Sequence, residues 1–186
     1  MKTPHPILLP PSLRLLLLAL LALAAGACST LERSAPPKLA ADAAWVVLPF
    51  ANHTETPLAG GRAESVAEGL LRALGVAKVR RYPAALQQEV LFEGADARQQ
   101  EAALAWAREQ GARYALSGGV DEWRYKVGVD GEPAVGVTLS IIDVASGETL
   151  WSGVGGKSGW SREALSAVAR QLMHKLLAGG LAGRQD

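Results

Sequence analysis

Residue types that commonly build active sites are scarce in this chain. Its 186 residues include one cysteine, three histidines and 5% aromatic residues. A single cysteine excludes an intramolecular disulfide, and no Cys/His pair has the spacing of a metal site. His53 lies in a polar loop, and His174 lies late in the last expected helix, where we expect it at the surface. The sequence therefore predicts no metal, no cofactor and no thiol catalysis.

Phosphate-binding motifs and one-sided charge are also lacking. The formal net charge is +1, and no basic run indicates nucleic-acid binding. Residues 153–158, Gly-Val-Gly-Gly-Lys-Ser, fail the phosphate-loop pattern because Trp151 stands where its first glycine belongs. We expect this segment to be a flexible exit from the last strand. Glu64 and Glu68 lie four apart on the first expected helix, where a solvated face is favoured over an acid–base pair. The chain is therefore not predicted to be an enzyme.

The N-terminus contains a three-part segment that ends at the only cysteine. Lys2 and Arg14 are basic, residues 15–25 are aliphatic, and residues 25–27 are small. This is the order of a secretory signal, and Cys28 directly after it resembles a bacterial lipoprotein signal. In that chemistry the thiol of Cys28 receives a diacylglyceryl group and the cysteine becomes the first residue. Two alternatives are a transmembrane anchor, which needs about 20 apolar residues, and a plain secretory signal with an incidental cysteine.

The remainder has the length of one domain. We predict a lipoprotein signal peptide over residues 1–27, a lipidated tether over 28–44 and a periplasmic α/β domain over 45–186. The tether is rich in Ser, Pro, Ala and charge. Ser29 rather than aspartate follows the cysteine. By resemblance to lipoproteins of enteric bacteria, the missing inner-membrane retention signal indicates the outer membrane.

Hydrophobic periodicity predicts an α/β fold with a single mixed β-sheet, parallel at its βαβ start and antiparallel in its final meander, with helices packed on it. Gly118-Gly119 predicts a bulge, Asp130-Gly131 a two-residue hairpin, Ser146-Gly147 a turn, and Ser161 the cap of the last helix. The expected strands are residues 45–50, 76–82, 113–127, 134–144 and 148–154, and the expected helices are 63–74, 83–92, 96–110 and 161–178.

Five longer motifs stand out along the chain. They are Leu-Pro-Phe-Ala-Asn-His-Thr-Glu-Thr-Pro at 48–57, Glu-Trp-Arg-Tyr-Lys at 122–126, Val-Asp-Gly-Glu-Pro-Ala-Val-Gly at 129–136, Ile-Asp-Val-Ala-Ser-Gly-Glu-Thr-Leu-Trp-Ser-Gly at 142–153 and Ser-Gly-Trp-Ser-Arg-Glu at 158–163. Together these motifs resemble the PelC family, outer-membrane lipoproteins of the Pel exopolysaccharide secretion apparatus. The pattern Asp-x-Ala-Ser-Gly-Glu followed by Leu-Trp-Ser also recurs in curli-pore, TolB amino-terminal and peptidoglycan-synthase-activator lipoproteins, which share this mixed α/β fold.

The resemblance implies a non-enzymatic lipoprotein at the periplasmic face of the outer membrane, held to the lipid through Cys28. Such a protein forms a ring of identical subunits beside a PelB-like β-barrel with periplasmic repeats. The ring guides a cationic polysaccharide toward the export pore. The alternative is a lipoprotein activator that binds a peptidoglycan synthase, and a hydrolase is a third hypothesis that lacks a nucleophile and a base. A curli-type pore is not expected, because the turns leave no extra membrane-spanning hairpin.

Two surface hypotheses follow. Trp160 precedes the last helix, where it either packs back on that helix as a hydrophobic staple or contacts the membrane at the headgroup level. Asp130 is either only a turn residue or, with Glu132, Asp121 and Glu122, part of an acidic surface that guides the polysaccharide. In a ring, each carboxylate would be repeated by symmetry.

Overall fold

The structure, a computed structural model, describes residues 10, 12, 29–86, 95–128 and 131–185. Cys28, Asp130 and most of the expected short helix after Pro83 lie outside these residues, so what was predicted for them stays a prediction. The helices are α2 (Ala59–Ala73), η1, a 3₁₀ turn (Ala84–Leu86), α3 (Ala95–Glu109) and α4 (Leu165–Gly180). The strands are β1 (Ser29–Arg33), β2 (Leu39–Ala40), β3 (Trp45–Asn52), β4 (Val79–Arg81), β5 (Tyr114–Tyr125), β6 (Pro133–Asp143), β7 (Thr149–Ser158) and β8 (Arg184–Gln185).

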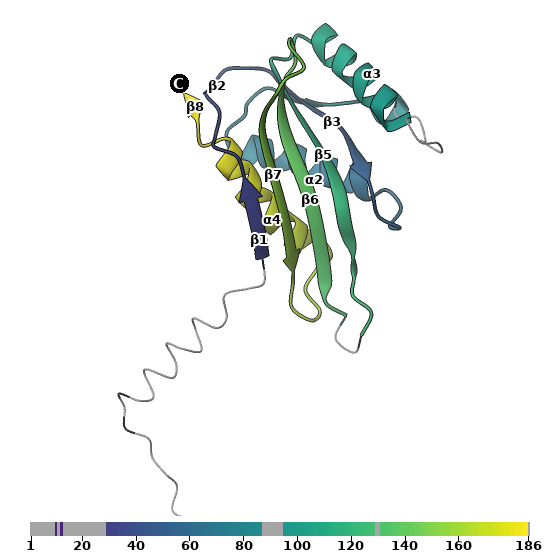
Figure 1. Ribbon diagram of the computed structural model, residues 1–186, viewed down its shortest axis with the longest axis vertical. Coiled ribbons are helices and arrows are strands. Elements are labelled where there is room, and N and C mark those ends of the chain that lie inside the picture. Colours follow the sequence, from purple (N-terminus) through teal and green to yellow (C-terminus); the bar gives the residue numbers. More distant parts are fainter. Residues whose placement is uncertain (1–9, 11, 13–28, 87–94, 129–130, 186) are drawn as a thin grey trace, which may run out of the picture.

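One six-stranded sheet organises the fold, in the order β1-β7-β6-β5-β3-β4 (Figure 1). β3 is parallel to both β4 and β5, whereas each neighbouring pair in the series β5, β6, β7 and β1 is antiparallel. The predicted mixed sheet, with its parallel start and antiparallel meander, is thus confirmed. A second, two-stranded parallel sheet pairs β2 with β8. No helix among the described residues is both long and apolar enough to cross a membrane.

Helices cover both faces of the sheet. α2 and α4 pack side by side across one face, and α3 packs near β3 on the other (Figure 1). β3 is buried on both faces because alternate residues enter the two cores. Trp45 and Val47 face α2 and α4, whereas Val46 and Leu48 face α3. The continuous apolar run at 45–50 therefore predicted this strand correctly.

Two glycines let β7 continue through the segment that was predicted to be a flexible exit. A Cβ at Gly155 would lie 2.9 Å from Leu172 Cδ1, and a Cβ at Gly153 would lie 2.6 Å from the Trp151 ring. Leu172 and Trp151 are both fully buried. The prediction of a loop was wrong, because these glycines accommodate core side chains within a regular strand.

β1 corrects the predicted tether. Ser29–Arg33 pairs antiparallel with β7, with Ser29 opposite Lys157 and Arg33 opposite Gly153. Leu31 packs against the main core, and Arg33 Nη1 donates to the carbonyl of Lys175 near the end of α4 at 3.3 Å. Residues 29–33, which were expected to lie in the tether, therefore form part of the main sheet.

Three local predictions need correction. The irregularity of β5 against β6 falls between Val120 and Glu122, and Gly118 and Gly119 pair regularly with β6. The connection from β5 to β6 spans 126–132, longer than the predicted two-residue hairpin, although Gly131 has a positive φ of 51°. The last helix begins at Leu165, after Ala164, with no side-chain cap from Ser161. The turn at Gly147, with φ of 77°, is confirmed.

Candidate functional site

Three segments meet at one end of the sheet, which we call the hairpin end. They are the start of β1, the β5–β6 connection and the β7–α4 loop (Figure 1). Lys126 Nζ donates to Ser158 Oγ at 2.7 Å, and the N–H of Gly159 donates to the Pro133 carbonyl at 2.8 Å. Hydrogen bonds thus link the β5–β6 hairpin to the end of β7 and to the first residue of the loop that follows, and Ser29 begins β1 opposite Lys157.

Exposed apolar side chains gather at the hairpin end. Trp160 is 72% exposed and Tyr125 is 51% exposed, and Val127 is fully exposed. The Tyr125 hydroxyl accepts from the N–H of Leu165 at 3.1 Å, which joins β5 to the start of α4. The sequence singled out Trp160 but not Tyr125 or Val127.

The exposure of Trp160 argues against the staple hypothesis. A staple side chain would be buried against the first turns of α4, yet most of this indole is in solvent. The loop is held instead by Glu163, whose Oε2 accepts from the Trp160 N–H at 3.1 Å. Arg162 has a φ of 67°, which is unusual for a residue with a side chain. The backbone therefore presents the indole outward.

Of the four acidic residues predicted to act together, the three that the structure describes do not form one cluster. Glu132 lies in the β5–β6 connection, and its Oε2 is 4.0 Å from Lys126 Nζ. Glu122 on β5 lies opposite Gly136 on β6. Gly136 is four residues after Glu132, so about 13 Å of strand separates the two acids. Glu122 Oε1 accepts from Arg124 Nε at 3.0 Å. Asp130 is outside the described residues, so its place relative to Glu132 stays a prediction.

Asp121 occupies the irregularity in β5 and contacts two neighbours. Its Oδ1 is 3.1 Å from His53 Nδ1, and its Oδ2 accepts from Thr138 Oγ1 at 3.3 Å. A Cβ at Gly119 would lie 3.2 Å from the His53 ring, so the absence of a side chain at Gly119 leaves room for the imidazole. His53, Asp121 and Glu122 therefore form a polar group on the sheet face opposite α2 and α4. Glu122 is paired there with Arg124, and Asp121 is paired with His53.

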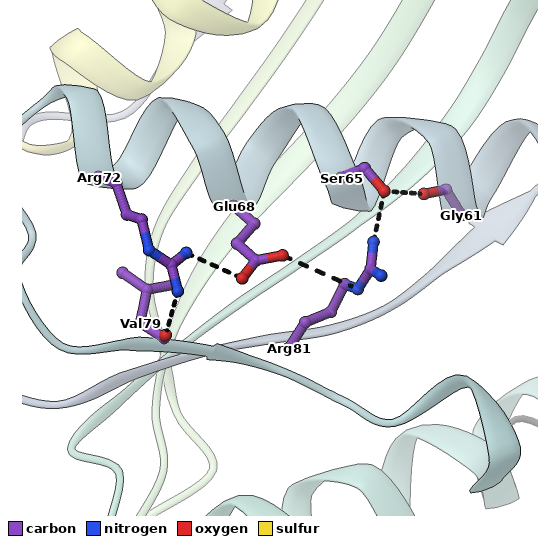
Figure 2. Close-up of polar contacts among 6 residues, drawn as sticks. All are labelled: Gly61, Ser65, Glu68, Arg72, Val79 and Arg81. Atoms are coloured by element: carbon purple, nitrogen blue, oxygen red, sulfur yellow. Dashed lines mark hydrogen bonds and ion pairs between the residues drawn. The ribbon is translucent and has the colours of Figure 1, made fainter.

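Glu64 and Glu68 do not form an acid–base pair. Glu64 is 3% exposed and accepts from the N–H of Phe50 at 3.0 Å, so the expected solvated face was wrong for this residue. Glu68 lies between two guanidinium groups, 2.8 Å from Arg72 Nη1 and 3.9 Å from Arg81 Nε (Figure 2). The two carboxylates thus hold α2 against β3 and β4, which is a structural role.

Asp143 is a carboxylate that sequence reasoning missed. Its Oδ1 accepts from the N–H groups of Ala145 and Ser146, and its Oδ2 is 3.2 Å from Arg113 Nη2. The hydrogen bond from the Ser146 N–H and the charge of Arg113 lower the pKa of Asp143, while burial opposes them. The signal was Asp-Val-Ala-Ser-Gly, an Asp that can accept from the backbone of its own turn. This group fixes the β6–β7 turn.

The described part of the chain offers no metal centre. No group of three or more His, Cys, Asp or Glu side chains there could hold a metal ion. His174 is exposed on α4, as predicted.

Family comparisons define the class of protein. Residues 63–156 match the family described as the peptidoglycan-synthase activator LpoB. Lipoprotein GNA1162 from Neisseria meningitidis is 20% identical, with a TM-score of 0.52 over 73% of this chain and 95% of that one, and so shares the fold. No curated protein sequence matches. None of these matches is to a catalytic family.

Solved structures of PelC from Paraburkholderia phytofirmans are similar over most of the chain. One PelC dodecamer is 47% identical, with a TM-score of 0.70 over 84% of this chain and 99% of that one. A dodecamer of a single-substitution variant has the same identity, with a TM-score of 0.68 over 81% of this chain and 97% of that one. The chain therefore belongs to the LpoB family through residues 63–156 and to the PelC family over most of its length. The resemblance to PelC stated from the sequence motifs is confirmed.

Proposed function

We propose that this chain is an outer-membrane lipoprotein that assembles into a periplasmic ring and guides a cationic exopolysaccharide to its export barrel. The observation that carries this proposal is the 47% identity to dodecameric PelC over 84% of this chain and 99% of that one. A synthase activator is the second candidate, supported by the LpoB match over residues 63–156. The ring is favoured because the match to PelC covers 99% of the PelC chain.

The native mass of the detergent-solubilised protein tests the ring. We expect a closed oligomer of many identical subunits, as in the PelC relatives. Deleting the gene in its own host should also stop polysaccharide secretion and leave peptidoglycan synthesis unchanged. A monomer whose loss slows peptidoglycan synthesis would favour the activator instead.

The second part of the proposal concerns membrane attachment. Cys28 immediately precedes β1, so an acylated Cys28 would place the hairpin end against the bilayer. The exposed Trp160 and Val127 lie at that same end. Tryptophan favours the headgroup level of a membrane because its ring is amphipathic. We therefore propose Trp160 as a membrane contact that supplements the lipid.

Liposome binding of the Cys28→Ser protein, which carries no lipid, isolates the contribution of Trp160. Trp160→Ala in that background should lower binding. The matched control is Leu58→Ala, at the exposed residue directly before α2, which should leave binding unchanged. Equal binding by both variants would remove Trp160 from the membrane contact.

The third part concerns the polysaccharide. Asp130, Glu132, Asp121 and Glu122 are proposed to attract a polycation, because symmetry in a ring repeats each carboxylate around the axis. Lys126 and Arg124 offset part of this charge within one subunit. The attraction should weaken at high salt, since exposed charges are screened beyond about 10 Å at 0.1 M.

A further inference from the structure

The helix face of the molecule carries a groove that no described residue fills. It runs between α2 and α4, with a volume of about 450 Å³, and its floor contains the apolar side chains of Val66 and Leu70. Arg170 stands at its border and is exposed. The residues that line the groove are Ser65, Val66, Gly69, Leu70, Ala73, Ser166, Ala167 and Arg170.

No packing contact among the described residues requires glycine at position 69 in this groove. A Cβ there would meet no atom within 4 Å. Gly60 on the same helix differs, because its Cβ would lie 2.4 Å from the Phe50 carbonyl oxygen. Glycine in the exposed middle of a helix is destabilising relative to alanine, and it permits the close approach of another backbone. Gly69 therefore leaves room for another chain to approach the groove.

The opposite face of the sheet carries one apolar residue that fits such a groove. Val154 on β7 is 45% exposed. It points away from α2 and α4, because its neighbours Gly153 and Gly155 face Leu176 and Leu172. Glu32 on β1 is paired directly with Val154 and is also exposed, so the two side chains lie together on this face.

We propose that Val154 and Glu32 of one copy dock on the α2–α4 groove of the next copy, with Glu32 facing Arg170. This inference rests on the proposed ring and names the surfaces that build it. Neither Glu32 nor Arg170 forms an ion pair within the described part of the chain. An apolar side chain beside a carboxylate therefore meets an apolar groove beside a guanidinium. The two surfaces are complementary in both polarity and charge.

The arrangement also satisfies the symmetry of a ring. Contact between two different surfaces is head-to-tail, and it closes into a ring when the rotation permits. The two surfaces lie at the same level along the strands, because Gly155, next to Val154, approaches Leu172, two residues after Arg170. An axis along the strands then keeps the hairpin ends of all copies on one side. This agrees with anchoring every copy to one membrane.

Cysteine pairing tests the contact in the full-length protein. The double variant Gly69→Cys with Val154→Cys should form a ladder of disulfide-linked oligomers on mild oxidation, since a bridge needs Cα atoms within about 7 Å. Wild type, whose only cysteine is Cys28, and each single variant are the background. The matched control is Gly69→Cys with Val127→Cys, because Val127 lies at the hairpin end and should give no ladder.

Charge exchange supplies the second measurement. Arg170→Glu should raise the protein concentration needed for assembly by roughly tenfold, because like charges then face each other. Adding Glu32→Arg should restore it. No ladder and no restoration, with an intact ring by native mass, would overturn this contact and leave the ring standing. A wild-type monomer would instead contradict the proposed ring itself.

Discussion

Trp151, within β7, and Trp160, in the β7–α4 loop, should respond to truncation to very different extents. Trp151 is 1% exposed and its Nε1 donates to the Ser34 carbonyl at 3.2 Å, whereas Trp160 is 72% exposed. Because a tryptophan offers about 250 Å² of surface, Trp151 buries nearly all of it and Trp160 about 70 Å². At about 25 cal/mol per Å², the upper bounds are about 6 and about 2 kcal/mol.

Trp151→Ala should therefore lower the free energy of unfolding by about 3–5 kcal/mol, the usual range for a buried aromatic side chain. Trp160→Ala should lower it by about 1 kcal/mol. The assay is urea unfolding followed by far-UV circular dichroism, with both variants at one protomer concentration because assembly stabilises the folded state. A loss at Trp160 as large as that at Trp151 would refute the exposed loop and restore the staple. A loss below about 1 kcal/mol at Trp151 would refute the packing of α4 on β7.

Three further predictions address the anchor, the acidic surface and pH. Cys28→Ala should leave the domain folded but remove it from the outer membrane, and retention in that fraction after a high-salt wash would contradict lipid as the main anchor. Asp130→Asn combined with Glu132→Gln should keep the native mass of the ring and impair polysaccharide export, since asparagine keeps the turn conformation; normal export would leave Asp130 as a turn residue only. Because the folded-state pKa of Asp143 is lowered, its stabilisation is present above the ordinary aspartate pKa of about 3.9 and is lost as the pH falls below that value. Asp143→Asn should flatten the acid limb of the stability profile measured by urea unfolding, and an unchanged limb would contradict this role.

The elements predicted correctly are those whose burial follows the chain locally. The apolar run at Trp45 forms a strand between two helix layers, and the spacing of Ala63, Ala67 and Leu70 forms α2. β1 was missed because Ser-Thr-Leu-Glu-Arg has a single strongly apolar residue, and only the free edge of β7 makes it a strand. The end of β7 was missed because glycine usually weakens strands. Both depend on tertiary partners that a local pattern does not contain.

The residues of the candidate site likewise fall into those that the sequence identified and those that depend on tertiary contacts. Trp160 was identifiable because a tryptophan before a helix is conspicuous, and its exposure now separates the two hypotheses. The burial of Glu64 could not be predicted, since it depends on the N–H of Phe50, from a different element. The groove at Gly69 was also missed, because it exists only where α4 lies beside α2.

The start of β1 at residue 29 sets the mechanics of the proposed anchor. Consecutive Cα atoms are 3.8 Å apart, so an acylated Cys28 would have almost no slack before the chain enters the sheet. The domain would then stand at a fixed height and tilt on the bilayer, unlike a protein on a long leash. In a ring, this same one-residue connection in every subunit would hold all subunits in a single plane. A force on the polysaccharide would then be transmitted to the membrane directly. A flexible linker inserted between Cys28 and β1 would let the height and tilt of the ring on the bilayer vary, without changing any contact inside the ring.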